Sequence, residues 1–242
     1  ALIAICPSYV KRLGVAGHKT HVVLNPFGSG NPAAAAPETS ILNRSPAHGG
    51  IRLLLVGARQ EKGLLEAMRA VNLIRDAHLT VAGRTHATLV QRSWSSEDTT
   101  LNGYQRRVVR WIEQNPEAAR RIHFLGEVPG IAEAMRDSDV VLIPWMMPHF
   151  SRPMFEAWLM HRPVVVFDTE GVVEFCEDEV NAMVVPRGDW RAMASAVERL
   201  KVDRALRQQL VENGHFHARS LVNDKNSAQA ILRVYEQVAV DW

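Results

Sequence analysis

The sequence has few cysteines and no long apolar run. Its 242 residues include only Cys6 and Cys176, which lack the close spacing of a metal site and weakly indicate a reducing compartment. No apolar run approaches the roughly 18 residues that a membrane-spanning helix needs. The opening ALIAIC lacks the basic lead of a signal peptide. We therefore expect a cytoplasmic protein that holds no metal.

Charge of one sign is also scarce, because the net charge is only +2. Residues 1–130 hold 16 Lys and Arg against 9 Asp and Glu, which gives +7, whereas residues 131–242 hold 12 against 17, which gives −5. A basic front half suits an anionic ligand or a membrane surface, although a difference this small is also typical of a solvated face. Peripheral membrane contact is therefore one expectation.

Short apolar strands alternate with helical patterns from residue 51 onward. Strands are expected at 51–56, 79–82, 122–125, 139–143, 163–167 and 181–185. Helices are expected at 62–74, 103–115, 130–137, 152–160, 189–200, 203–218 and 225–239. Continuous apolar strands separated by helices predict an α/β fold: a Rossmann-like, parallel six-stranded sheet flanked by helices.

The front of the chain has a different composition. Residues 1–24 contain two short strand candidates around a small helix candidate, and residues 25–50 are dense in Pro, Gly, Ala, Ser and Asn. The second stretch has no apolar periodicity, so it is predicted to be a linker or long surface loop. Because the first residue is Ala rather than Met, we expect the chain to be a fragment or a processed product.

Ligands of such sheets bind at the carboxyl ends of the strands, so the loops that follow strands are the candidate sites. In VGARQEKG (56–63), Gly57 allows a sharp turn, and Arg59 and Lys62 precede a helix. Two cations at a strand-to-helix turn can hold a diphosphate, helped by the amides of the helix N-terminus. The alternative is that both are solvated loop charges.

The loop PWMMPHFSRPMFE (144–156) is the second candidate. Ser151 can cap a helix with Pro153 in its first turn, which leaves the amides of about 150–152 free to meet an anion. Glu156 lies among apolar residues and needs a partner, because a lone buried carboxylate costs several kcal/mol. That partner is either an arginine, such as Arg162, or the vicinal hydroxyls of a ligand, as a ribose offers.

Two more residues of these loops are candidates. His149 can contact a sugar or a phosphate, although a lone loop histidine is more often solvated. Glu174 follows the strand at 163–167, within FDTEGVVEF, and has the same exposed alternative.

Other ligand classes fit the sequence poorly. No glycine-rich turn has the spacing and the downstream acidic residue of an NAD site. YQRRVVR (104–110) is basic but has the pattern of one exposed helix face without an aromatic stacking platform, so we expect no nucleic-acid partner.

Four segments, in order, resemble one enzyme family. They are VGARQEKGLLEAM, RIHFLGEVPGIAEAMRDSDVVLIP, FSRPMFEAWLMHRPVVVFDTEGVVEF and NAMVVPRGDWRAMASAVERL. Residues 51–239 thereby resemble the C-terminal, donor-binding domain of retaining GT-B glycosyltransferases, the family 4-like "glycosyl transferases group 1". Residues 1–24 resemble the end of the preceding N-terminal acceptor domain, whose remainder is missing, and residues 25–50 its interdomain linker. The resemblance implies that 51–242 is a Rossmann-like nucleotide-sugar-binding domain.

The resemblance also implies a chemistry: transfer of a hexose from a nucleoside-diphosphate sugar to a saccharide or lipid-linked acceptor, with no required metal. Arg59 and Lys62 would hold the diphosphate, and Glu156 would bind the ribose. The donor-binding residues so implied are Gly57, His149, Phe150, Ser151, Glu156 and Glu174.

The sequence departs from the family at one informative position. Many members carry a second glutamate, in contact with the transferred sugar, where this chain has Pro148. Proline has no side-chain acceptor. The alternative to an enzyme is therefore a catalytically inactive nucleotide-sugar-binding or regulatory module.

Overall fold

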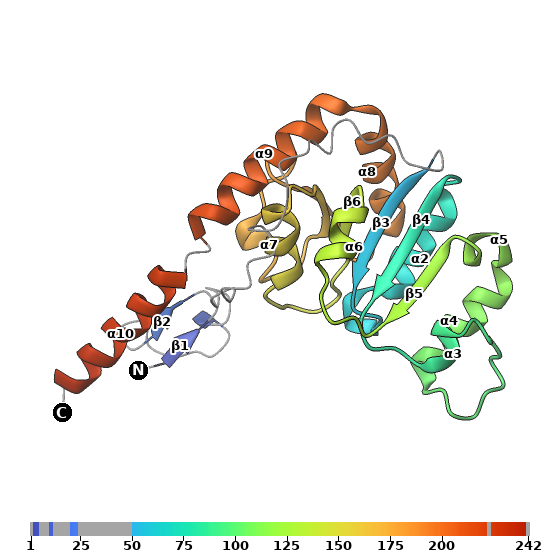
Figure 1. Cartoon of the computed structure of the whole chain (residues 1–242), viewed down its shortest axis with the longest axis horizontal. Coiled ribbons are helices and arrows are strands. Elements are labelled where there is room, and N and C mark those ends of the chain that lie inside the picture. Colours follow the sequence, from blue (N-terminus) through green and yellow to red (C-terminus); the bar gives the residue numbers. More distant parts are fainter. Residues whose placement is uncertain (1, 5–9, 12–19, 24–49, 222–223, 241–242) are drawn as a thin grey trace.

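The computed structural model describes residues 2–4, 10–11, 20–23, 50–221 and 224–240. Its main body is a parallel six-stranded sheet with helices on both faces (Figure 1). The strands are β3 (Ile51–Val56), β4 (Ala77–Ala82), β5 (Ile122–Gly126), β6 (Val140–Ile143), β7 (Val164–Phe167) and β8 (Met183–Val185). The predicted fold class is confirmed. Each of the six expected strands begins within two residues of the observed strand's first residue.

Seven longer helices match the predicted pattern. They are α2 (Leu64–Leu73), α4 (Gly103–Gln114), α6 (Ala132–Asp137), α7 (Arg152–Leu159), α8 (Trp190–Val202), α9 (Arg204–Leu221) and α10 (Asp224–Val240). The sequence did not predict α3 (Ala87–Val90), α5 (Pro116–Ala119), or the 3-10 turns η4 (Gln60–Lys62) and η5 (Val173–Phe175). Elements of three or four residues are too short to show an apolar period.

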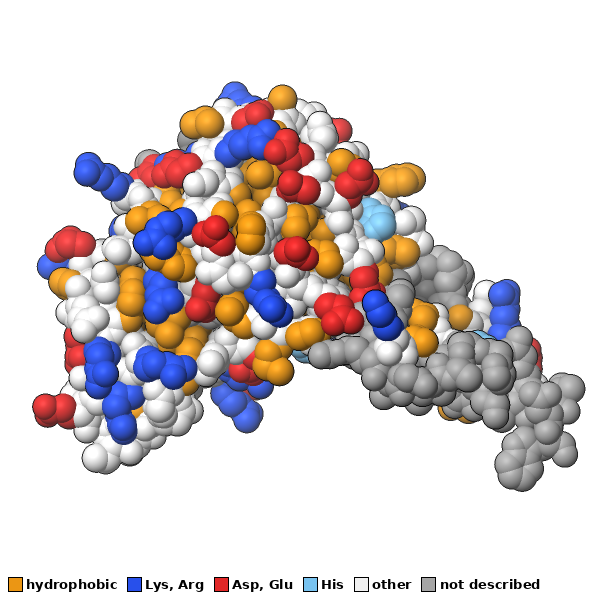
Figure 2. All heavy atoms as spheres, turned by 180° about the vertical axis from the view of Figure 1, so that it is seen from behind, with side chains coloured by type: hydrophobic (Ala, Val, Ile, Leu, Met, Phe, Trp, Pro, Cys, Tyr) orange, Lys and Arg blue, Asp and Glu red, His pale blue; other side chains and the backbone are white. Residues whose placement is uncertain are grey.

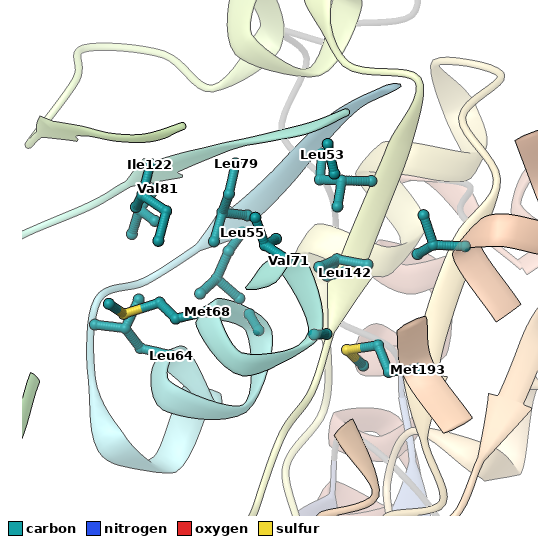
Figure 3. Close-up of a cluster of buried hydrophobic side chains, with 14 of the residues drawn as sticks. Leu53, Leu55, Leu64, Met68, Val71, Leu79, Val81, Ile122, Leu142 and Met193 are labelled. Atoms are coloured by element: carbon teal, nitrogen blue, oxygen red, sulfur yellow. The ribbon is translucent and has the colours of Figure 1, made fainter. Parts of the chain in front are cut away.

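Both faces of the sheet are buried. Leu53 and Leu55 point to one face, where they pack with α2, α4 and α8, whereas Leu54 points to the other, where α6 and α7 lie. Figure 3 shows part of the first cluster, in which Met68 of α2 and Met193 of α8 approach the sheet side chains. This double burial explains why the strands are continuously apolar rather than alternating.

The order of the strands positions the candidate site. Across the sheet the strands lie in the order β5-β4-β3-β6-β7-β8. The first strand of this sheet, β3, and β6 are therefore neighbours in the middle, and the strand order reverses between them. The helices that follow these two strands, α2 and α7, leave on opposite faces. A crevice at the carboxyl ends of β3 and β6 is the usual ligand position in such sheets.

The front of the chain is described only in part. Strands β1 (Leu2–Ala4) and β2 (Thr20–Val22) pair in parallel as a separate two-stranded sheet. Apart from Gly50, the predicted linker lies outside the described residues, so the domain boundaries stay a prediction. Within the described chain, no helix combines the length and the apolar character needed to cross a membrane.

Helices α7 and α9 pack closely where Gly214 meets Trp158. The indole is fully buried, and its Nε1 donates a hydrogen bond of 3.0 Å to the carbonyl oxygen of Asn181. A Cβ at Gly214 would lie 2.4 Å from an indole carbon. This contact therefore requires glycine, although glycine is a poor helix former.

We predict that Gly214→Ala lowers the free energy of unfolding by about 1–2 kcal/mol, because overpacking costs more than alanine's better helix propensity returns. Urea denaturation measures the change. Gly103→Ala is the matched control: Gly103 is also helical, and a Cβ there meets no atom within 4 Å. If both substitutions have the same effect, the Gly214–Trp158 contact is not a packing constraint.

Candidate functional site

The loops after β3 and β6 are in direct contact at the carboxyl edge of the sheet. Gly63 has φ +70°, and a Cβ there would lie 1.9 Å from the carbonyl oxygen of Pro144. The backbone N–H of Met146 donates to the carbonyl oxygen of Glu61 at 3.0 Å. These two contacts hold the cation-bearing turn against the loop that begins α7.

Lys62 is buried at this junction, with 9% of its surface exposed. Its Nζ lies 3.1 Å from the ring centroid of Trp145, a cation–π contact. Lys62 forms no ion pair within the described part of the chain. Its pKa is lowered to about 8, chiefly by burial and then by the charge of Arg59, while the charge of Glu61 opposes both. The solvated-charge alternative is therefore wrong for Lys62.

Arg59 is the exposed member of the pair. Its Nε lies 2.9 Å from Glu61 Oε1, and 64% of its side chain is exposed. Its charge nevertheless acts on Lys62, whose pKa it lowers. Arg59 thus adds positive potential to the site from the solvent side.

Gly57 shapes the turn beneath Lys62. Its φ of +104° is unfavourable for other residues, and its N–H donates to the carbonyl oxygen of Ala82 at 2.7 Å. A Cβ at Gly57 would lie 3.0 Å from Lys62 Cγ. The glycine therefore both permits the turn and leaves room for the lysine stem.

His149 joins the same cluster from the loop after β6. Its ring centroid lies 4.4 Å from that of Trp145. Burial lowers the pKa of His149, and the charges of Lys62 and Arg59 lower it further. The loop is tied to the one after β7, because the His149 N–H donates to Glu170 O at 3.2 Å and Thr169 Oγ1 donates to Trp145 O at 2.6 Å.

Ser151 occupies the predicted N-cap position of α7 but does not cap it. Its side chain makes no capping hydrogen bond, and Oγ is buried without a partner among the described residues. An unsatisfied buried hydroxyl costs about 1–3 kcal/mol. The start of α7 therefore carries a hydroxyl whose hydrogen-bonding capacity the described protein atoms leave unused.

Glu156 is buried, as predicted, and its partner in the structure is Arg152. The Arg152 Nε donates to Glu156 Oε1 at 2.8 Å. Burial raises the pKa of Glu156, while the Arg152 charge opposes the rise. Arg162 instead donates to the carbonyl oxygens of Met135 and Arg136. The opposing cation is two-thirds exposed, so one face of the pair is open to solvent.

The structure brings only some of the predicted residues together. Lys62 and His149 both contact Trp145, and Gly57 lies against the Lys62 side chain. No ion pair or hydrogen bond joins Lys62 to Glu156 among the described residues; Glu156 lies on α7, which directly follows the 144–151 loop that carries Trp145.

Phe150 and Glu174 lie differently. The Phe150 ring packs in the core against Phe155 and Phe175, with centroids 5.2 and 5.9 Å away, so its side chain faces the interior. Glu174 is exposed on η5, beside Phe175.

Sequence reasoning missed two residues of the site. Trp145 directly follows the strand and its Pro144, so the rule that led to the strand-end loops could have found it. Arg152 stands four residues before Glu156, the spacing at which charges pair on a helix. In the described residues, no group of three or more His, Cys, Asp and Glu could hold a metal ion.

Comparison with known proteins gives the family. The sequence model described as "Glycosyl transferases group 1" matches residues 50–203, more than half of the chain. The chain belongs to this family. The matched region contains both loops of the site and all six strands of the main sheet.

Individual relatives agree with this assignment. The chain is 21% identical to the lipopolysaccharide core biosynthesis glycosyltransferase LpsD of Rhizobium meliloti over 237 residues. This match covers 98% of the chain and 63% of that relative. The chain is 35% identical over 121 residues to the phosphatidyl-myo-inositol mannosyltransferase of Mycobacterium leprae, covering 49% of the chain and 32% of that relative. The chain thus spans less than two-thirds of these proteins.

A solved structure shows the fold. The Anabaena protein HepE in complex with UDP superposes with a TM-score of 0.75 at 18% identity, covering 97% of this chain and 63% of that one. At this identity the likeness carries the fold alone, and that fold is GT-B. This chain, which covers 63% of HepE, contains one complete six-stranded Rossmann-like sheet.

We predict that the Lys62 ammonium titrates with a midpoint near pH 8, against about 10.4 for an unperturbed lysine. The 13Cε chemical shift of Lys62, assigned with Lys62→Arg, measures the midpoint. Lys201 is the internal control: burial alone would lower its pKa, but its hydrogen bonds to Asp76 and Glu198 raise it. A Lys62 midpoint at or above that of Lys201 contradicts the burial described for Lys62.

Proposed function

We propose that the protein containing this chain transfers a hexose from a nucleoside-diphosphate sugar to a saccharide or lipid-linked acceptor, with retention at the anomeric carbon. The observation that carries the proposal is the buried Lys62 ammonium over Trp145, at the junction of the β3 and β6 loops. A cation without an ion-pair partner at a strand-order reversal is suited to bind an anion. A cytoplasmic location, with contact at a membrane surface, is part of this proposal.

In this reaction the bond between the anomeric carbon and the β-phosphate oxygen breaks, and a bond from that carbon to an acceptor oxygen forms. The acceptor hydroxyl loses its proton, and the nucleoside diphosphate leaves with added negative charge. Lys62 and Arg59 stabilise that charge electrostatically. Because the two side chains can do so without a divalent cation, we propose that no metal is required.

The start of α7 completes the donor site. The amides near Phe150 and Ser151 offer hydrogen bonds to a phosphate, as does the Ser151 hydroxyl, which has no partner among the described residues. Glu156 accepts hydrogen bonds from the ribose hydroxyls once the exposed Arg152 swings aside. Gly57, His149 and Glu174 are proposed to border the donor. The HepE complex with UDP supports uridine as the nucleoside.

We predict that Lys62→Ala weakens UDP binding by about tenfold or more, because a charge-assisted hydrogen bond is worth about 1.5–3 kcal/mol. Wild-type affinity is also expected to fall as pH rises through about 8, where Lys62 loses its proton. Isothermal titration calorimetry at pH 7 and pH 9 measures both effects. Lys201→Ala, which removes a lysine engaged by Asp76 and Glu198, should leave UDP affinity unchanged.

Glu156→Gln separates the ribose contact from the diphosphate contact. It should weaken UDP binding while leaving affinity for inorganic pyrophosphate unchanged, because pyrophosphate has no ribose. Equal effects on both ligands would argue against ribose recognition by Glu156, and unchanged UDP binding in Lys62→Ala would remove the basis of the diphosphate site.

The absence of an acidic side chain at Pro148 favours a second candidate, an inactive nucleotide-sugar-binding module. The two candidates differ in turnover. If the full-length protein binds UDP-sugars through Lys62 but neither transfers nor hydrolyses them, it is the inactive module. If it transfers the sugar and the transfer depends on Lys62, it is the enzyme.

A further inference from the structure

A hollow lies beside the proposed donor site, between α2 and α4. It has a volume of about 400 Å3, within the usual range of small-ligand pockets. Its walls join through two bonds: the Leu65 N–H donates to Tyr104 Oη at 3.3 Å, and Arg107 Nη2 donates to Gln60 Oε1 at 3.0 Å. The hollow is therefore bounded by connected elements rather than by unrelated surface side chains.

The hollow is strongly basic. Arg69, Arg107 and Arg110 line it, against a single carboxylate, Glu66. Arg69 lies 3.9 Å from Glu66, whereas neither Arg107 nor Arg110 has an acidic partner within the described part of the chain. Figure 2 shows blue Lys and Arg side chains with orange apolar groups between them at the lower left, where α4 lies after the 180° turn from Figure 1. Two cations are thus available to an anion.

Aromatic surface accompanies these cations. Tyr104 and Trp111 are half-buried and line the same hollow, and the Arg107 guanidinium lies 5.4 Å from the centre of the Tyr104 ring. The C–H face of a sugar ring packs on an aromatic face, while its hydroxyls accept hydrogen bonds from arginine and can both accept from and donate to glutamine. Arginines and aromatics together are suited to a saccharide that carries a phosphate or carboxylate.

The position of the hollow connects it to the reaction site. Gln60, on its rim, belongs to the same 3-10 turn as Lys62, and Met146, also on the rim, directly follows Trp145. The Met146 N–H bonds to Glu61 O. A ligand that fills the hollow therefore ends beside the Lys62–Trp145 contact.

We propose that the hollow between α2 and α4 binds an anionic saccharide, phosphorylated or carboxylated, beside the proposed donor site. This site is additional to the acceptor site, which the family resemblance assigns to the N-terminal domain. Arg107 and Arg110 hold the anionic group, and Tyr104 and Trp111 hold the ring. A volume of about 400 Å3 accommodates one or two sugar units rather than a nucleic-acid strand.

The test measures binding of glucose 6-phosphate, glucuronate, glucose and inorganic phosphate to the chain by calorimetry. At least one anionic sugar should bind about tenfold or more tightly than both glucose and phosphate, because ring and charge contribute together. Upon its addition, the Trp111 indole N–H and Met146 methyl signals should shift in NMR spectra. Absence of binding by both anionic sugars, or phosphate binding as tightly as either, overturns the proposal.

The matched variants are Arg107→Gln/Arg110→Gln and, as a control with the same loss of charge outside the hollow, Arg120→Gln/Arg204→Gln. The first pair should weaken anionic-sugar binding by about tenfold or more, and the second should not; equal weakening overturns the proposal. UDP affinity measures the donor site separately. If UDP binding is retained in Arg107→Gln/Arg110→Gln but lost in Lys62→Ala, the hollow and the donor site are tested independently.

Discussion

The contact between the loops after β3 and β6 is the constraint on which the rest of the site depends. It exists because Gly63 adopts φ +70° and leaves no side chain against the Pro144 carbonyl. This contact carries Lys62 over Trp145 and ties Glu61 to Met146. Any side chain at position 63 would separate the two loops, and with them the cation from the start of α7.

The site keeps charge in places where burial is unfavourable. Lys62 is desolvated, and its contact with Trp145 and the nearby Glu61 offset the cost only in part, since its pKa remains lowered. Glu156 is also desolvated, but it retains Arg152. Lys62, a buried cation without an ion pair among the described residues, and Glu156, whose partner lies on the exposed side, both have unfavourable solvation. The proposed anionic, hydroxyl-bearing donor would relieve it.

The basic hollow between α2 and α4 gives a physical role to a segment that sequence reasoning treated as a solvated helix face. YQRRVVR alternates between the two environments: Val108 and Val109 are buried in the core, whereas Arg107 and Arg110 reach the hollow. The sequence of this segment does not show the aromatic pattern of a nucleic-acid stacking platform. In the folded protein, however, Tyr104 and Trp111 line the same hollow as both arginines. A shared rim at Gln60 and Met146 then places this surface next to the candidate donor site.

The sequence alone determined the six strands, the long helices and the parallel sheet, because continuous apolar runs between helical periods can be buried in few other ways. It also located the two loops and the buried Glu156. Only the tertiary structure decided that Lys62 rather than Arg59 is the buried cation and that Trp145 lies under it. It also decided that Arg152 partners Glu156 and that the Ser151 hydroxyl has no partner among the described residues. The reason is that these contacts join residues through the packing of separate loops, and neither composition nor periodicity encodes which side chain turns inward where two loops meet.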